Sequence, residues 1–266
     1  MRIQHNIPAM NAYRNLSLNN SALNKNLEKL SSGYKINRAG DDAAGLAISE
    51  KMRSQITGLQ TAQKNAKDGI SMVQSAEGAL TEVHDMLNRM VELATQAANG
   101  TYTSDDQGYL NQEFSELKSE IDRIAQKTRF NDQQIFQSNT IVLQVGEKSG
   151  DEISFNVGTL AGLIGASVAV DSATGAKAAI STINEAIKTV NGTRATLGAT
   201  QNRLEHTINN LGVVTENIQD AESTIRDTDI AEEMMAYTKN NILIQSAQAM
   251  LAQANQVPQG VLQLLQ

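Results

Sequence analysis

Apolar and small residues recur at alternating steps of three and four along residues 59–97. The steps continue without a break over about five heptads, which is typical of a coiled-coil seam. Asp42 and the pair Asn99-Gly100 are suitable caps, so the pattern predicts one helix between them, roughly 85 Å long. The seam positions are Leu59, Ala62, Ala66, Gly69, Val73, Ala76, Leu80, Val83, Leu87, Met90, Ala94 and Ala97.

Two further helices are predicted after this one. A shorter stripe from Leu110 to Ile124 follows Asp105-Asp106 and predicts a helix about half as long as the first. In the third helix an apolar residue stands at every seventh position over seven repeats. Helices with matching stripes bury them against one another, so an antiparallel rod is expected. The heptad positions of the third helix are Ile183, Val190, Leu197, Leu204, Leu211, Ile218 and Ile225.

Both ends of the chain carry the same period of seven. The pattern predicts two terminal helices that pair with each other and bring residues 1–30 beside residues 235–266. Pro258 is expected to kink or end the second of these helices. The stripe near the N-terminus is Ala9, Leu16, Leu23 and Leu30, and the stripe near the C-terminus is Tyr237, Ile244, Leu251, Pro258 and Leu265, with Ala247, Ala254 and Val261 between.

The centre of the chain follows a different pattern. Apolar residues alternate with polar ones along 141–145 and again along 153–157, on either side of a Gly-containing segment. This alternation predicts a β-hairpin near residues 141–157. Residues 158–176 are rich in Gly, Ala and Ser, which indicates a loop. The expected fold class is therefore mainly α: a long antiparallel coiled-coil rod with a small β-hairpin, plus paired terminal helices.

The composition excludes several protein classes. The chain has no cysteine, which rules out disulfide scaffolds, thiol enzymes and cysteine-ligated metal sites. Its few aromatic residues favour thin helical seams over a thick core. The net charge of -7 argues against a nucleic-acid partner. Neither a secretory signal peptide nor a membrane-spanning stretch is present in the sequence, so no membrane partner is expected.

Charge is distributed unevenly between the two ends. Residues 240–266 contain no charged residue, whereas residues 1–38 contain six positive charges and one negative charge. The uncharged segment is expected to be a helix buried against other chains, and an uncharged surface helix or a disordered tail is the alternative. Isolated helices of this kind are marginal in water, so both ends are expected to be disordered in the free monomer and to fold on assembly.

Nothing in the sequence supports catalysis. The three histidines, His5, His84 and His206, have no partner at metal-ligand spacing, and no phosphate-binding loop, dinucleotide fingerprint or nucleophile elbow is present. Asp41-Asp42 suits helix capping better than acid–base chemistry. The pattern Asn-Gly-Thr occurs twice, at Asn99 and Asn191, and fits a short glycosylation consensus. No catalytic residue, cofactor or metal is expected.

Two long segments resemble those of bacterial flagellin. Residues 30–48 read LSSGYKINRAGDDAAGLAI, and residues 246–266 read SAQAMLAQANQVPQGVLQLLQ. The segment 3–7 and the run Phe130-Asn131-Asp132 are also similar to that family. The resemblance implies a filament-core domain, D0, formed by residues 1–42 with 227–266, and a helical rod domain, D1, formed by residues 43–226. No outer D2 or D3 domain is expected.

The resemblance also implies a function. Flagellins are exported unfolded by the flagellar type III system, without a cleaved signal, and polymerise beneath a cap into a hollow extracellular filament used for motility. The implied partners are other copies of the chain, the cap and hook-junction proteins, the export chaperone and the type III export gate. Filament-core assembly is assigned to Leu16, Leu23, Leu30, Ile244, Leu251, Val261 and Leu265. The D1 core seam is assigned to Leu59, Val73, Leu80, Leu87, Leu197, Leu204 and Leu211.

Innate immune receptors are further partners implied by the resemblance. Flagellins are recognised by Toll-like receptor 5 through D1, and the matching segment here is residues 87–96 with the next helix. Subunit contacts are the alternative role for the side chains off the seam. The C-terminal leucines Leu262, Leu264 and Leu265 resemble the segment sensed by NAIP-type receptors. The residues assigned to Toll-like receptor 5 are Arg89, Glu92, Leu93, Gln96 and Glu113.

Two other functions remain open from the sequence. A flagellin-like protein of the hook–filament junction would share the terminal helices and the export route. A secreted coiled-coil protein that stays monomeric would share the rod. The long match at the C-terminus favours flagellin over both.

Overall fold

The structure, a computed structural model, describes residues 6–137, 140–165 and 168–264, and from residue 257 onward only the course of the backbone. Its helices in these ranges are α1 (Ile7–Ser32), α2 (Ala43–Ala97), α3 (Ser104–Lys127), α4 (Ala173–Arg226) and α5 (Ile230–Leu264). Its strands are β1 (Arg129–Phe130), β2 (Gln133–Gln134), β3 (Thr140–Gln144) and β4 (Glu152–Asn156). The mainly α fold class predicted from the sequence is confirmed.

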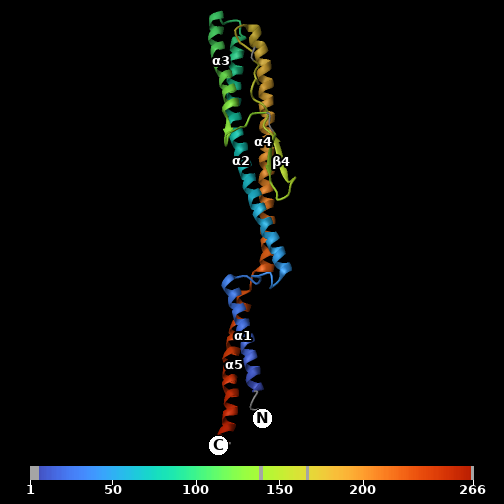
Figure 1. Cartoon of the computed structure of the whole chain (residues 1–266). Coiled ribbons are helices and arrows are strands. Elements are labelled where there is room, and N and C mark those ends of the chain that lie inside the picture. The colour runs from blue at the N-terminus through green and yellow to red at the C-terminus, as the bar shows by residue number, and fades with distance from the viewer. Residues whose placement is uncertain (1–5, 138–139, 166–167, 265–266) are drawn as a thin grey trace. The chain divides into compact units, whose positions relative to one another are not determined.

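The chain divides into two compact units (Figure 1). The first, called here the terminal unit, comprises Met1–Ile56 and Glu216–Gln266. The second, the central unit, comprises Thr57–Thr215. The predicted D0 and D1 boundaries at residues 42 and 227 remain a prediction.

The core of the central unit is a seam between α2, α3 and α4, which run side by side (Figure 1). All twelve positions of the predicted seam on α2 are buried, and nine of them have no exposed surface at all. The D1 seam residues are all buried: Leu59, Val73, Leu80, Leu87, Leu197, Leu204 and Leu211. This seam is built from aliphatic side chains at helical spacing, and Phe114 of α3 is one of the few aromatic side chains in it.

Both α2 and α3 are capped at their N-termini. Asp42 Oδ1 accepts a hydrogen bond from the Gly45 backbone N–H at 2.9 Å, as expected for an N-cap of α2. α3 begins with a capping box, in which Thr103 accepts from the Asp106 N–H at 3.3 Å and Asp106 accepts from the Thr103 N–H at 3.0 Å. These caps satisfy backbone groups that would otherwise have no partner in the helix, which fixes where α2 and α3 begin.

The predicted hairpin is present, and the described part of the segment after it is a loop as expected, except that α4 already begins at Ala173. β3 and β4 pair antiparallel with Val142 opposite Ser154, and their inner residues Ile153 and Phe155 are buried. Three apolar side chains of this loop pack into the core: Leu160, Ile164 and Val170. These three apolar residues are surrounded by Gly, Ala and Ser in the sequence, so the composition did not identify them as core residues.

A second, smaller hairpin was not predicted. β1 and β2 pair antiparallel, with Phe130 opposite Gln133. The two residues between them, Asn131 and Asp132, have positive φ angles of 48° and 63°. Asn and Asp tolerate this left-handed region better than most residues, so this pair suits a tight hairpin turn. The strands are two residues long, too short to show alternation in the sequence.

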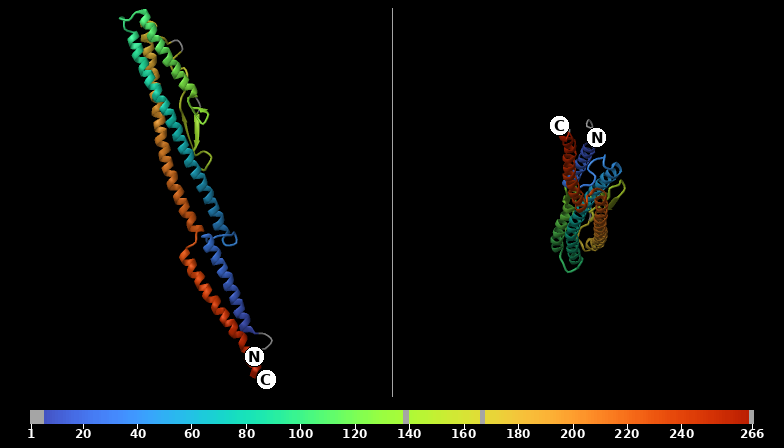
Figure 2. Two further views of the ribbon diagram at one scale, coloured as in Figure 1. Left: turned by 90° about the vertical axis from the view of Figure 1, so that its left-hand side faces the viewer. Right: turned by 90° about the horizontal axis from the view of Figure 1, so that it is seen from below.

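In the terminal unit, α1 and α5 lie side by side (Figures 1 and 2). The predicted pairing of the terminal helices is therefore confirmed for the described residues. The sequence predicts that Pro258 kinks or ends α5. An end at Pro258 is wrong, because the helix continues to Leu264, and the kink stays a prediction. Among the described residues, no helix contains a stretch long and apolar enough to cross a bilayer.

Candidate assembly surface and Arg89 cluster

The α1–α5 pair is held by half-buried side chains at the predicted heptad positions. Leu16, Leu23 and Leu30 of α1 and Leu251 of α5 are partly buried, and Ile244 is 9% exposed. The Val261 side chain and the whole of Leu265 lie outside the described residues. Because most of these residues keep part of their surface exposed, the pair alone buries only part of its apolar stripe.

Asn26 is the one buried residue that α1 contributes, at 8% exposure. With its amide oriented to satisfy its neighbours, the nitrogen donates to Glu233 Oε1 at 3.0 Å and to the Ala22 carbonyl at 2.9 Å. Its oxygen accepts from the Tyr237 N–H at 3.2 Å and from Asn240 Nδ2 at 3.0 Å. A satisfied polar residue inside an apolar seam selects one register of two helices, because any shift leaves it unpaired.

A salt bridge joins the same two helices beside Asn26. Lys29 Nζ lies 3.6 Å from Glu233 Oε2, and the Glu233 side chain is only 12% exposed. Glu233 is thereby shared between Lys29 and Asn26. These contacts fix the start of α5 against the end of α1.

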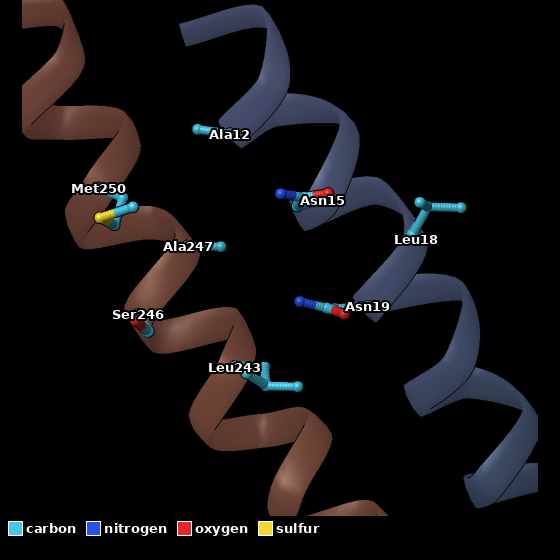
Figure 3. A pocket seen from close by; sticks show the side chains of 8 residues that line it. All are labelled: Ala12, Asn15, Leu18, Asn19, Leu243, Ser246, Ala247 and Met250. Carbon is cyan, nitrogen blue, oxygen red and sulfur yellow. The ribbon is translucent and has the colours of Figure 1, made fainter. Parts of the chain in front are cut away.

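A groove of about 350 Å³ runs between α1 and α5 in their middle portion. Figure 3 shows Ala12 and Ala247 pointing into this groove, with Asn15 and Asn19 directed at α5. Leu18 of α1 also lines the groove and is 62% exposed. Small and amide side chains therefore leave the facing surfaces of the two helices incompletely packed.

Exposed apolar side chains are concentrated on these two helices. Among the described residues, seventeen large apolar side chains are exposed, and eleven of them belong to α1 or α5. Clustered apolar exposure of this kind marks an interaction surface on a soluble protein. The eleven are Ile7, Met10, Tyr13, Leu18, Leu27, Ile230, Met234, Met235, Ile242, Leu243 and Met250.

The junction of the terminal unit connects the end of α1 to the end of α4. Gly33, with φ of 76°, ends α1 in the left-handed conformation, and its carbonyl accepts from the Thr228 N–H at 3.0 Å. The Arg226 guanidinium stacks over the Tyr34 ring, 4.6 Å from its centroid, and donates to Glu50 Oε1 at 2.6 Å. The hydrogen bond from Arg226 lowers the pKa of Glu50 below its ordinary value.

The central unit carries a charged cluster on the face shared by α2 and α3. Arg89 donates to Glu113 Oε1 of α3 at 2.9 Å and to Glu92 Oε2 at 2.9 Å. We call these three residues the Arg89 cluster. Hydrogen bonds first to Glu113 and then to Glu92 raise the pKa of Arg89, so its guanidinium stays charged at neutral pH. All three side chains are about half exposed and accessible to a partner in the isolated chain.

Two other residues assigned to the same recognition surface fall in different environments. Gln96 is exposed one turn beyond Glu92. Leu93 has no exposed surface and belongs to the core, so the expectation that it lies off the seam is wrong. It lies one turn from Arg89, on the flank of α2 next to α3, where three packed helices bury a stripe wider than a two-helix seam. With no exposed surface, Leu93 offers nothing for direct contact with a partner.

No metal-binding group of three or more acidic, histidine or cysteine side chains was found within the described ranges. His84 and His206 lie separately, on α2 and α4. Asp41 Oδ2 accepts from the Arg38 backbone N–H at 3.1 Å and Asp42 caps α2, so both carboxylates are occupied with backbone groups.

Comparison with known proteins matches both ends of the chain to one family. The model of the bacterial flagellin N-terminal helical region matches residues 3–140, and the model of the bacterial flagellin C-terminal helical region matches residues 180–265. The flagellin of Halalkalibacterium halodurans is 55% identical, and the alignment covers 100% of both chains. The flagellar filament 33 kDa core protein of Treponema phagedenis is 47% identical, again over 100% of both chains.

A solved structure agrees with these sequence matches. The crystal structure of Bacillus cereus flagellin superposes with a TM-score of 0.52 at 34% sequence identity. The superposition covers 56% of this chain and 88% of that one.

Proposed function

The chain belongs to the bacterial flagellin family, and we propose that it polymerises through the exposed apolar surface of α1 and α5 after export by the flagellar type III system. It is a structural subunit of the flagellar filament, not an enzyme. What remains to be assigned is how the subunit joins its neighbours, how it reaches the filament and which other proteins recognise it.

The apolar exposure of the terminal helices carries this proposal. Eleven of the seventeen exposed large apolar side chains lie on α1 and α5, and no residue after Lys239 is charged. Leaving this surface in water is unfavourable by about 25 cal/mol per Å² of apolar area, and burial against neighbouring subunits removes that cost. We assign the core of the filament, D0, to residues 1–42 with 227–266, and the surrounding rod, D1, to residues 43–226.

The absence of a large outer domain fits the same assignment. Only residues 157–172 connect β4 to α4, and part of this segment is packed into the core of the central unit. An additional D2 or D3 domain therefore has no segment from which to fold. The filament surface would be formed by the rod and its β3–β4 hairpin.

Export unfolded through a narrow channel accounts for two features of the chain. A sequence without cysteine cannot form disulfide cross-links during its passage through the channel or outside the cell. Marginally stable terminal helices would be disordered in the free monomer and would be available to an export chaperone and to the export gate. The filament cap and the hook-junction proteins would contact the same α1–α5 surface at the two ends of the polymer.

Deletion of residues 240–266 tests the assembly proposal. The truncated chain should keep the helical signal of the central unit and remain monomeric when seeded with filament fragments, whereas the full chain should elongate the seeds. Met250→Lys, which places a charge at a residue 66% exposed on α5, should also block elongation. Val142→Lys, at a residue 52% exposed on β3, is the control for a charge outside the terminal unit. Filaments of normal length from the truncated chain would refute the proposal.

Recognition by innate immune receptors is a second role that we propose. Arg89, Glu92, Gln96 and Glu113 would form the contact with Toll-like receptor 5, because exposed arginine in a charged cluster is favoured at protein interfaces. Leu262, Leu264 and Leu265 would form the segment bound by NAIP-type receptors. Both surfaces need to be accessible, so the free monomer and not the filament would be the ligand.

A further inference from the structure

The chain contains the tripeptide Asn-Gly-Thr twice, in two different backbone environments. Asn99-Gly-Thr101 lies in the turn between α2 and α3, and Asn191-Gly-Thr193 lies inside α4. We propose that Asn99 is a site of spontaneous deamidation through a succinimide, and that α4 protects Asn191 from the same reaction. The sequence around the reacting atoms is identical, so the fold alone separates the two sites.

The reacting groups at Asn99 lie outside both helices and are exposed. Asn99 and Gly100 are both exposed, two and three residues beyond the last residue of α2, Ala97. The Asn99 N–H donates to the Gln96 carbonyl at 3.0 Å, and within the described residues the Gly100 N–H has no hydrogen-bond acceptor. Apart from its two chain neighbours, no residue comes within 4 Å of the position that a Cβ on Gly100 would occupy, so Gly100 is not packed against the rest of the fold.

The reaction needs only water as a co-reactant. The backbone nitrogen of Gly100 attacks the side-chain carbonyl carbon of Asn99, a C–N bond forms, and the side-chain amide leaves as ammonia. The resulting five-membered succinimide is then hydrolysed at either carbonyl, which gives aspartate or isoaspartate. Oxidation states do not change, and the net reaction exchanges one ammonia for one water.

α4 blocks this reaction at Asn191 although this residue is exposed too. Asn191 and Gly192 lie within the helix Ala173–Arg226, where the Gly192 N–H belongs to the backbone hydrogen-bond ladder. Ring closure requires the backbone to leave helical angles so that the nitrogen can reach the side-chain carbon. That movement would break hydrogen bonds on both sides of Asn191, in a helix that is packed through Val190 and Leu197.

Deamidation at Asn99 would alter the tip of the central unit. It adds one negative charge to a chain of net charge -7, two residues after the C-terminal end of α2. A negative charge there is repelled by the partial negative charge of the helix C-terminus. The Ala97 carbonyl at this end accepts from Gln107 Nε2 of α3 at 3.0 Å, so the contact between α2 and α3 lies next to the modified residue.

Peptide mapping by mass spectrometry of the full-length chain tests the proposal. After incubation at mildly alkaline pH, aspartate and isoaspartate should accumulate at Asn99 while Asn191 stays largely intact. In denaturant the two sites should react at similar rates, because the helix no longer protects Asn191. Gly100→Ala, which meets no neighbour and needs no positive φ, should fold normally and slow the reaction at Asn99 several-fold.

Two results would overturn the proposal. Equal conversion at Asn99 and Asn191 in the folded chain would show that the turn gives no advantage. Equal rates of conversion at Asn99 in the folded wild type and in folded Gly100→Ala would also contradict it. That result would show that the glycine nitrogen has no advantage as the attacking group.

Discussion

The side-chain amide of Asn6 donates a hydrogen bond of 2.8 Å to the backbone carbonyl of Ala254. This carbonyl lies four residues before Pro258, which has no N–H to offer it in the helix. Asn6 also caps α1, because its side-chain oxygen accepts from the Ala9 N–H at 3.2 Å. One side chain thus caps the first helix and supplies the donor that proline removes from the last, which is why α5 can continue past Pro258.

This relationship predicts that the effects of Asn6 and Pro258 are coupled. Asn6→Ala should lower filament stability by about 1 kcal/mol for the lost cap, and further for the unpaired Ala254 carbonyl. In a Pro258→Ala background the restored helical N–H should reduce the cost of Asn6→Ala. The temperature at which filaments dissociate measures the effect of Asn6→Ala in the wild-type and in the Pro258→Ala background. Asn11→Ala, at an exposed position of α1, is the control. Equal losses in the two backgrounds would mean that Asn6 acts only as a cap.

Asn26 is expected to set the register of α1 against α5. Asn26→Leu should destabilise the filament by about 1–3 kcal/mol, because Asn240 and the Tyr237 N–H lose their acceptor. Asn20→Leu, at an exposed position one to two turns earlier, should leave the dissociation temperature nearly unchanged. If Asn26→Leu instead raised the dissociation temperature, apolar packing would stabilise the seam more than the hydrogen bonds of Asn26 do.

The Glu50–Arg226 pair predicts a specific dependence on pH. The hydrogen bond from Arg226 lowers the pKa of Glu50 from its ordinary value of 4.5. Its contribution to stability is therefore present above that ordinary value and is lost as the pH falls through the lowered pKa. A carboxyl titration followed by NMR should place the Glu50 midpoint below 4.5 in the wild type and move it upward in Arg226→Gln. An unchanged midpoint in Arg226→Gln would assign the lowering to another neighbour.

Two glycines of α2 should respond oppositely to the same substitution. Gly78 has open space around it, so Gly78→Ala should stabilise the central unit by about 0.5–1 kcal/mol through helix propensity. A Cβ on Gly69 would collide with the Leu143 side chain of β3, so Gly69→Ala should lose this gain or destabilise. Thermal unfolding of the monomer compares the two variants. Equal stabilisation would show that β3 is not packed tightly on α2.

Arg89 is expected to affect receptor binding more than folding. An exposed ion-pair network contributes little to stability, whereas an arginine at the centre of an interface is often essential. Arg89→Ala should weaken binding of the monomer to Toll-like receptor 5 by roughly fivefold or more, with its unfolding temperature nearly unchanged. Arg123→Ala removes a comparable exposed pair with Glu120 on α3 and serves as the control. Equal affinities for the wild type and Arg89→Ala would contradict the assignment.

Heptad periodicity predicted the helices because a seam between two helices repeats every seven residues. It placed Leu80 and Leu197 in the core correctly, and it located the pairing of α1 with α5. It failed at Leu93, because α2 packs against both α3 and α4 and a single-seam pattern cannot represent a second buried flank. Heptad periodicity located the pairing of α1 with α5, but it did not identify the individual polar contacts between them.

Asn6 and Asn26 illustrate why the remaining features were not predicted. Each is polar, so the hydrophobic pattern predicts a surface residue. Its hydrogen-bond partners on α5, however, lie more than two hundred residues away in the sequence. Only the folded pairing of the two helices brings these groups together. Likewise, Leu160, Ile164 and Val170 lie in a segment rich in small residues and follow no regular spacing. Their burial becomes evident only in the folded structure.

Electron cryo-microscopy with helical reconstruction of filaments assembled from the full chain tests the central claim most directly. We expect the α1–α5 pairs of successive subunits to pack against one another around the inner channel, with the exposed apolar side chains of Met250 and Tyr13 buried between subunits. A map in which α1 and α5 face solvent on the outside of the filament, while the central units alone make the subunit contacts, would contradict the account.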